Sequence, residues 1–201
     1  GKDITFEEIY QQYDAVFLGI GATEGKVLSY ELYQHANIYM AVPFLTNTQK
    51  KLEGFDFDKK YQVKGKRVIV IGGGDTAMDC VRTSIREGAA KVQCVYRRDE
   101  ENMPGSRKEV KSAKDEGVEF VFHRSPKNFV SNEEGEIIGV NFVRTEVVKA
   151  EGDRGKLIEL EGSDHLFTAD IFILALGFNN QRIQFLADHG IETTDWGAIV
   201  V

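Results

Sequence analysis

Two short stretches of the sequence carry residue types whose spacing could bind a charged ligand. The first is the glycine-rich run Gly72–Ala77, GGGDTA, which follows the apolar-rich residues Arg67–Ile71. The second is the arginine pair Arg97 and Arg98, which follows the apolar residues Val92, Cys94 and Val95 and then Tyr96. Glycine turns expose backbone N–H groups to anions, and guanidinium groups bind phosphate through parallel hydrogen bonds. Because the 201-residue chain has a formal net charge of -7, any basic site must be local.

Both stretches follow runs that the pattern predicts to be strands. The Val/Ile-rich residues 67–71 are typical of a parallel strand that is buried on both faces. Small and apolar residues then recur on one face of a predicted helix, namely Ala77, Cys80, Val81, Ser84 and Ile85. Gly88 ends this helix, and residues 92–96 form the next strand. Together they predict a βαβ unit with a right-handed crossover.

The flanking segments predict further helices and one more strand. Residues 13–22 have the pattern of a short buried strand that ends in glycines, and residues 40–52 that of a short helix. Residues 106–117 predict a polar surface helix that begins after Ser106, with Glu109 completing a capping box. These elements flank the βαβ unit on both sides.

The second half of the chain predicts a change from parallel to antiparallel strands. Residues 118–122 form a third strand after the surface helix. Residues 126–168 then alternate between short strands and turns, which predicts an antiparallel meander in place of another helix. Residues 169–178 return as a buried strand. The order of elements therefore predicts an α/β domain.

Each small residue of the glycine turn has a physical reason if the turn binds a dinucleotide. Gly72 allows a tight turn out of the strand, and Gly74 lets a pyrophosphate approach the backbone. Ala77 is small enough for the helix to pack closely on the sheet. The alternative is a glycine turn with a structural role alone. The strand before it and the helix after it favour the dinucleotide-binding interpretation.

Two polar residues in the turn have less specific roles. A carboxylate beside a pyrophosphate would repel it, so Asp75 is predicted to be the N-cap of the helix. Thr76 could cap the helix or donate its hydroxyl to a phosphate, and the sequence leaves both roles open.

The arginine pair predicts which dinucleotide is bound. In a unit of this kind an acid at the end of the second strand accepts the ribose 2′-OH of NAD, whereas an arginine binds the 2′-phosphate of NADP. Arg97 lies 23 residues beyond Gly74, and no acid occurs before Asp99. The arginines also disfavour S-adenosylmethionine. The alternative to phosphate binding is that Arg97 and Arg98 are solvated surface residues that pair with Asp99 and Glu100. Arg107 is either a third ligand of the phosphate or a surface residue of the next helix.

Composition argues against several other classes of protein. No apolar run approaches the roughly 20 residues of a membrane span, and the acidic charge argues against a nucleic-acid surface. Two cysteines, Cys80 and Cys94, without a CxxC spacing argue against a metal centre or a redox dithiol in this chain. We expect both to be buried small residues in a reducing cytoplasm. No side chain is proposed as catalytic, and the scattered histidines show no metal-ligand spacing.

Through these motifs the sequence resembles a known family. The block GGGDTAMDC, continued by YRRDEENMPGSR, is similar to the NADPH-binding domain of glutamate synthase small (beta) subunits and related flavin oxidoreductases. YDAVFLGIGAT, AVPFLTNT, VNFVRTE and ADIFILALGF also fit. The resemblance implies a Rossmann-like three-layer pyridine-nucleotide-binding domain with a parallel sheet and an antiparallel β-meander crossover.

The resemblance also implies roles for residues. The pyrophosphate would be held by Gly72, Gly73, Gly74, Asp75, Thr76 and Ala77. The 2′-phosphate would be held by Arg97 and Arg98, with Arg107 as a further candidate. Ala175, Leu176 and Gly177 would form a loop that approaches the dinucleotide. In the family NADPH gives a hydride to FAD, and electrons pass through iron–sulfur clusters to the large (alpha) subunit, where glutamine and 2-oxoglutarate yield glutamate.

The family's other parts are not found in the sequence. It contains no second G-x-G-x-x-G for FAD, no cysteine-rich region and no C-terminal Gly-Gly-Asp segment. We therefore expect residues 52–187 to be the NADPH-binding domain, with residues 1–51 and 188–201 as partial flanks of a flavin domain. Such a chain should bind NADPH without turnover. The alternatives are the same domain from a paralogous iron–sulfur flavoprotein, and a nucleotide-sensing module without redox chemistry.

Overall fold

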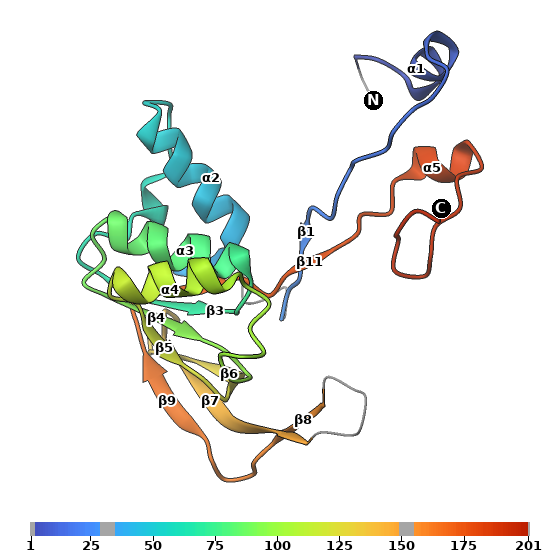
Figure 1. The fold of residues 1–201 in the computed structure, drawn as a ribbon. Helices are drawn as coiled ribbons and strands as arrows, with labels where there is room; N and C mark the ends of the chain where they lie inside the picture. The colour runs from blue at the N-terminus through green and yellow to red at the C-terminus, as the bar shows by residue number, and fades with distance from the viewer. Residues whose placement is uncertain (1–2, 29–34, 149–154, 201) are drawn as a thin grey trace. The chain divides into compact units, whose positions relative to one another are not determined.

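The computed structural model describes residues 3–28, 35–148 and 155–200 (Figure 1). The chain divides into two compact units. One unit is formed by Gly1–Glu24 together with Phe178–Val201, and the other by Gly25–Gly177. The larger unit contains both of the stretches that the sequence singled out.

A five-stranded parallel sheet lies at the centre of the larger unit. Its strand order is β2-β10-β3-β4-β5, and every neighbouring pair is parallel. The strands are β2 (Ile38–Met40), β3 (Arg67–Ile71), β4 (Lys91–Val95), β5 (Glu119–Val121) and β10 (Ile171–Leu174). Because all run the same way, their carboxyl ends meet at one edge of the sheet.

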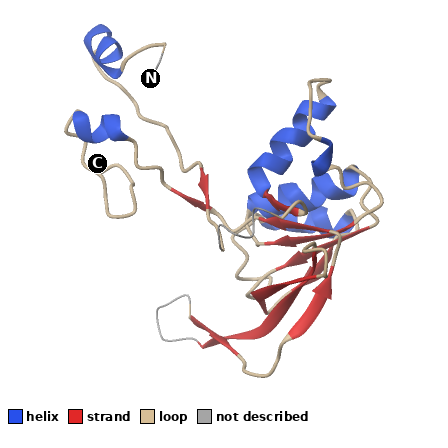
Figure 2. Cartoon of the chain, turned by 180° about the vertical axis from the view of Figure 1, so that it is seen from behind, coloured by secondary structure: helices blue, strands red, loops and turns tan. Residues whose placement is uncertain are grey.

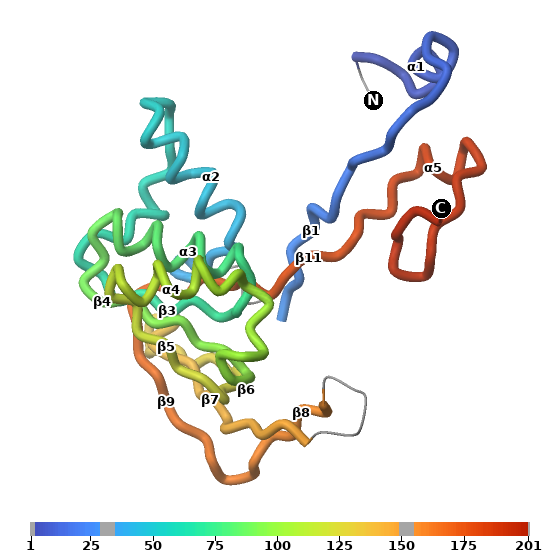
Figure 3. Tube along the Cα trace, viewed as in Figure 1, coloured from blue at the N-terminus to red at the C-terminus, as the bar shows by residue number. Residues whose placement is uncertain are grey.

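Helices cover one face of this sheet and an antiparallel sheet covers the other (Figures 1 and 2). The helices are α2 (Ala41–Leu52), α3 (Asp75–Arg86) and α4 (Arg107–Asp115), with a 3-10 turn at Lys59–Tyr61. The antiparallel strands are β6 (Arg124–Ser131), β7 (Ile137–Val148), β8 (Lys156–Glu159) and β9 (His165–Thr168). Figure 3 traces the chain from β5 through this meander. The predicted three-layer fold is therefore confirmed.

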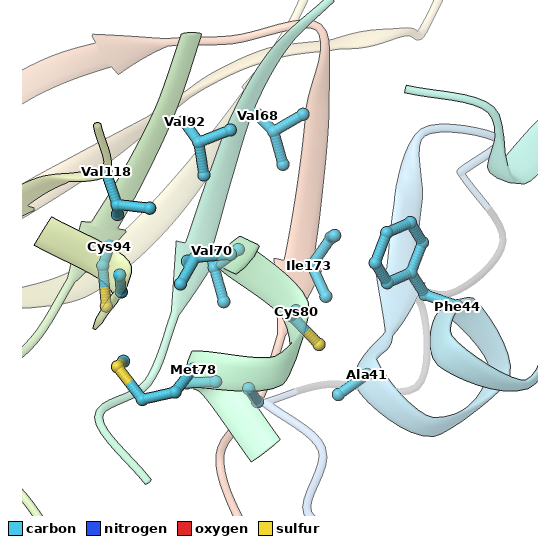
Figure 4. Close-up of a cluster of buried hydrophobic side chains, with 14 of the residues drawn as sticks. Ala41, Phe44, Val68, Val70, Met78, Cys80, Val92, Cys94, Val118 and Ile173 are labelled. Carbon is cyan, nitrogen blue, oxygen red and sulfur yellow. The ribbon is translucent and has the colours of Figure 1, made fainter. Parts of the chain in front are cut away.

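The alternation of side chains along the central strands builds two hydrophobic cores. Val68, Val70 and Ile173 face the helices, where they meet Met78 and Cys80 of α3 (Figure 4). The neighbouring residues of the same strands, including Ile69, Ile71 and Phe172, face the meander. Successive strand residues point to opposite faces, so a strand with a layer on each side must be apolar throughout.

The smaller unit brings its two helices together through aromatic rings. Helix α1 (Phe6–Gln12) begins with a complete capping box between Thr5 and Glu8, and α5 spans Gln184–Asp188. The ring of Phe6 stacks on Phe185 with centroids 5.4 Å apart. The short strands β1 (Glu24–Gly25) and β11 (Phe178–Asn179) pair with one another.

The predicted strand at residues 13–22 is wrong. The structure assigns no strand there, and the Phe17 side chain is 94% exposed. An apolar run forms a buried strand only when neighbouring strands accept its backbone hydrogen bonds, and among the described residues no strand pairs with this segment.

Two other boundaries differ from the prediction. The last parallel strand is Ile171–Leu174, shorter than the predicted 169–178. The three-residue edge strand β2 was not predicted, because its few residues show no periodicity of their own. Since β2 pairs with β10, residues 38–52 lie in the larger unit. The assignment of residues 1–51 and 188–201 to a flavin domain stays a prediction, and residues 1–2, 29–34 and 201 fall outside the described part.

Replacement of Phe172 by alanine should destabilise the chain by about 3–5 kcal/mol, because it opens a cavity between the sheet and the meander. The Phe172 side chain is fully buried and its ring lies edge-on to Phe129 at 5.9 Å. The free energy of unfolding from chemical denaturation tests this. The matched control is Leu52→Ala at the end of α2, where the side chain is 66% exposed and the loss should stay below about 1 kcal/mol. Equal losses in the two variants would contradict the assigned core.

Candidate functional site

The site is built where the carboxyl ends of β3, β4 and β10 meet. The Gly72 N–H, just beyond β3, donates to the Val95 carbonyl of β4 at 3.1 Å. The Ala175 N–H, just beyond β10, donates to the Ile71 carbonyl of β3 at 2.9 Å. The glycine turn therefore leaves the sheet between two neighbouring strand ends.

The three glycines of the turn face different surroundings. A Cβ on Gly72, whose φ is 149°, would lie 2.2 Å from the Ala175 carbonyl oxygen. A Cβ on Gly73 would lie 2.5 Å from the Tyr96 ring. At Gly74 the nearest atom would be Pro104 Cγ, 3.9 Å away. The first two glycines are thus required by the protein's own packing, whereas the third leaves open space beside the backbone.

Helix α3 begins at this open position. Its N-cap residue is Gly74, whose carbonyl accepts from the N–H groups of Ala77 at 2.9 Å and Met78 at 3.1 Å. Within the described ranges, the N–H groups of Asp75 and Thr76 have no acceptor. Ala77 is fully buried against the sheet, as its small size predicted. The first turn of α3 therefore presents donors and the positive end of the helix dipole.

The predicted role of Asp75 as N-cap is wrong. Asp75 is the first residue of α3, and its carboxylate accepts from the Ser106 N–H at 2.7 Å. Ser106 in turn caps α4, its hydroxyl accepting from the Glu109 N–H at 3.3 Å. Asp75 therefore ties the start of α4 to the start of α3. Its charge is directed at a neighbouring backbone N–H, a role that only the tertiary contact reveals.

The predicted capping box of α4 is only half formed. The Ser106 N–H goes to Asp75, and the Glu109 carboxylate pairs with Arg82 of α3. Arg82 also binds Glu116 through Nε at 3.0 Å and Nη2 at 2.8 Å. The hydrogen bond from Arg82 lowers the pKa of the Glu116 carboxyl, although its partial burial opposes this. The ion pairs hold α3 and α4 together beside the turn.

A loop between β4 and α4 folds back over the glycine turn. The Tyr96 hydroxyl donates to the Asn102 carbonyl at 2.9 Å, and Asp99 Oδ1 accepts from the Asn102 N–H at 2.9 Å. The Gly105 N–H donates to the Gly73 carbonyl at 3.0 Å, and a Cβ on Gly105 would lie 3.1 Å from that oxygen. Sequence reasoning missed the roles of Tyr96 and Gly105. Pro104-Gly105 signals a turn, but not where the turn packs.

The structure places the three candidate arginines differently. The Arg97 side chain is exposed and has no partner among the residues that the structure describes. Arg98 is partly buried, and its Nη2 donates to the Gly155 carbonyl at 3.0 Å. Arg107 is exposed as the first residue of α4, which Asp75 ties to the turn. Arg97 and Arg107 are therefore open to a ligand, while Arg98 already has an acceptor.

The segment from Ala175 to Gly177, which the resemblance predicts to approach the dinucleotide, lies next to the glycine turn. Ala175 is buried, and its carbonyl occupies the space that a Gly72 side chain would need. Leu176 packs against the core on the meander side. Gly177 has a φ of 90°, which explains the glycine, and its carbonyl accepts from the Lys26 N–H at 2.9 Å.

Both cysteines are free and buried, as the sequence predicted. The Cys94 thiol lies 3.3 Å from the Gly72 carbonyl, and burial raises its pKa to about 12. Burial raises the pKa of the Cys80 thiol as well. Neither thiol forms a thiolate at neutral pH, so in this chain both act as small packing groups below the turn.

An open groove of about 930 Å³ lies apart from these residues. Its walls come from α2, the loop after it and α3, with Leu45, Leu52 and Phe55 on its apolar part. Burial and the nearby carboxylates of Glu109 and Asp75 raise the pKa of Asp79 at its edge. None of the predicted site residues lines this groove.

Comparison with known proteins identifies the family of this chain. The chain matches the family model of pyridine nucleotide-disulphide oxidoreductases over residues 6–201. It belongs to this family. It is 44% identical over its whole length to the glutamate synthase [NADPH] small chain of Escherichia coli (strain K12), of which it covers 43%. The predicted resemblance to glutamate synthase small subunits is therefore confirmed, and the chain spans less than half the length of that relative.

Two further comparisons describe the family's range. The chain is 34% identical over its whole length to the NADPH-Fe(3+) oxidoreductase subunit beta of Geobacter sulfurreducens (strain DL-1 / KN400), of which it covers 29%. The solved structure of Mycobacterium tuberculosis FprA in complex with NADPH superposes with a TM-score of 0.66 at 16% identity, covering 88% of this chain and 52% of that one. This structural likeness concerns the fold alone.

The described ranges contain neither a helix that could span a membrane nor a cluster of metal-ligating side chains. None of the helices there combines the length and apolar character that a bilayer span requires. The same ranges bring together no group of three or more His, Cys, Asp or Glu side chains that could hold a metal ion.

The turn glycines should differ in their effect on stability. Gly72→Ala forces a methyl group into the Ala175 carbonyl and should destabilise the chain by about 2–3 kcal/mol. Gly74→Ala meets no close atom and should cost only about 1 kcal/mol, the usual loss for alanine at an N-cap. Chemical denaturation of both variants measures the difference. A Gly74→Ala variant that is destabilised as much as Gly72→Ala would contradict the open space beside Gly74.

Proposed function

We propose that this chain binds NADPH at the carboxyl ends of β3, β4 and β10, with the pyrophosphate at the first turn of α3. The open space beside Gly74 supports the proposal, because a Cβ there would fill it. The N–H groups of Asp75 and Thr76 also support the proposal, because the described residues supply no acceptor for them. In this arrangement Gly72, Gly73 and Ala77 shape the turn, and the Thr76 hydroxyl lies at the phosphate end of the helix.

The observation that carries the choice of NADPH over NADH is the exposed Arg97 at the end of β4. In the proposed complex its guanidinium binds the 2′-phosphate, and Arg107 approaches from the start of α4. Arg98 has a different position, because the phosphate would have to compete with the Gly155 carbonyl for its guanidinium. The segment from Ala175 to Gly177 lies on the other side of the turn, towards the nicotinamide half of the dinucleotide.

In the full-length protein we propose an NADPH-dependent oxidoreductase of the glutamate synthase small-subunit type. In such an enzyme NADPH would give a hydride to FAD. The two electrons would then leave FAD one at a time through iron–sulfur clusters to a large (alpha) subunit, where glutamine and 2-oxoglutarate would yield glutamate. The 44% identity to a glutamate synthase small chain supports this choice. The sequence contains one G-x-G-x-x-A turn, which we assign to NADPH, and no second turn of this kind for FAD. The 201-residue chain alone should therefore bind the dinucleotide without turnover. The proposed compartment is the cytoplasm.

A second candidate is a flavoprotein that delivers the same electrons to another acceptor. It is supported by the 34% identity to an NADPH-Fe(3+) oxidoreductase subunit. A nucleotide-sensing module would use the same site without redox chemistry. Steady-state assays of the full-length protein distinguish the three. Glutamate formation with a large subunit indicates the first, NADPH oxidation by Fe(3+) alone the second, and no NADPH oxidation the third.

Replacement of Arg97 by alanine should weaken NADPH binding about 10- to 150-fold and leave NADH binding nearly unchanged. The range corresponds to the roughly 1.5–3 kcal/mol of a hydrogen bond to a charged group. Isothermal titration calorimetry of the 201-residue chain with each dinucleotide measures both affinities. The proposal predicts that the preference for NADPH collapses in this variant.

Two controls sharpen the Arg97 experiment. Lys111→Ala removes an exposed cation that pairs with Asp115 on α4 and should change neither affinity. Arg107→Ala shows whether the second exposed arginine shares the phosphate. Equal affinity of the unmodified chain for NADPH and NADH would contradict the proposed selectivity. If Arg107→Ala loses the preference for NADPH and Arg97→Ala keeps it, Arg107 and not Arg97 binds the 2′-phosphate.

A further inference from the structure

One buried hydroxyl reaches the backbone of the arginine pair. Among the described residues, the buried polar side chains are Thr48, Ser84 and Thr145. The first two donate to carbonyls one turn back in their own helices, Thr48 to Phe44 at 3.0 Å and Ser84 to Cys80 at 2.8 Å. Thr145 alone of these three reaches another element.

Thr145 lies on β7 of the meander and is fully buried. Its hydroxyl donates to the Arg97 carbonyl at 2.7 Å, across 48 positions of sequence. A hydroxyl that is buried without an acceptor costs about 1–3 kcal/mol, so this bond strongly favours one position of the Arg97 peptide.

The start of the neighbouring strand, β6, together with His123 just before it, binds the carbonyls on either side of Arg97. The Tyr96 carbonyl accepts from the Arg124 N–H at 3.1 Å, and the Arg98 carbonyl from the His123 N–H at 3.2 Å. Three successive carbonyls after β4 are therefore held by donors from outside their own strand. The backbone that carries Arg97 is fixed by the meander even though the Arg97 side chain is exposed.

The donors themselves are braced. The His123 carbonyl accepts from the Thr145 N–H at 3.1 Å and from Arg124 Nη1 at 3.0 Å. His123 has a φ of 56°, a conformation that no other non-glycine residue in the described ranges adopts. Such a backbone persists only where surrounding bonds enforce it. Thr145 thus contributes two hydrogen bonds to this junction, one through its backbone and one through its side chain.

We propose that Thr145 is a positioning residue for dinucleotide selectivity: its hydroxyl fixes the Arg97 peptide so that the guanidinium faces the 2′-phosphate. The proposal rests on the proposed binding of NADPH through Arg97. It gives the meander a part in ligand recognition, since a strand that contacts no ligand sets the position of the arginine that does.

Thr145→Val tests the proposal because valine keeps the shape and burial and removes the hydroxyl. NADPH affinity should fall about 3- to 10-fold, the loss that one hydrogen bond accounts for, while NADH affinity stays within about twofold. Thr145→Ser restores the hydroxyl and should restore the NADPH preference. The measurement is calorimetric titration of the 201-residue chain with NADPH and with NADH, and the readout is the ratio of the two Kd values.

The ratio separates positioning from loss of structure. NADH binding reports how much of the chain retains a folded site, so a variant that only unfolds loses both affinities together, and that result overturns the proposal. The matched control is Thr48→Val, which removes a buried hydroxyl that bonds only within helix α2 and should leave the ratio unchanged.

The outcomes also distinguish this inference from the proposed function. If Arg97→Ala abolishes the preference and Thr145→Val keeps it, the role of Thr145 is overturned and NADPH binding through Arg97 stands. If the unmodified chain shows no preference for NADPH, the proposed function fails, and the positioning role fails with it. Loss of the preference in Thr145→Val and its return in Thr145→Ser support both.

Discussion

The site depends on one close approach between two strand ends. The Ala175 carbonyl beyond β10 occupies the space that any side chain at Gly72 would need. That contact lets the chain turn sharply out of β3, so that α3 begins directly above the carboxyl edge of the sheet. The donors of its first turn then face the opening beside Gly74. Without this approach, neither the turn nor the helix N-terminus would be in place for an anion.

The surroundings of the turn extend the same constraint. The Tyr96 ring lies against Gly73, and Gly105 binds the Gly73 carbonyl, so the β4–α4 loop is fixed to the turn. On the other side, the meander holds the carbonyls of residues 96–98 through Arg124, Thr145 and His123. The backbone at both proposed phosphate sites, at the turn and at Arg97, is therefore held by hydrogen bonds or packing from neighbouring elements. A fixed backbone at Arg97 lowers the conformational entropy that this exposed arginine would lose on binding a 2′-phosphate.

The sequence predicted the elements with strong local patterns. Residues 67–71 and 75–86 were predicted well, because a strand buried on both faces and an amphipathic helix each have a pattern of their own. The edge strand β2 is only three residues long and exists through its pairing with β10. The roles of Asp75 and Thr145 depend on partners 31 and 48 positions away, which no local pattern encodes. The apolar run at 13–22 shows the converse, because pattern alone does not form a strand where no neighbour pairs with it.

A crystal structure of the chain with NADPH would show whether one edge of the sheet binds both the pyrophosphate and the 2′-phosphate. We expect the pyrophosphate at the N–H groups of Asp75 and Thr76, and the 2′-phosphate within about 3 Å of the Arg97 guanidinium. A dinucleotide bound in the groove between α2 and α3, or with its 2′-phosphate turned into solvent away from Arg97, would contradict the proposed binding mode.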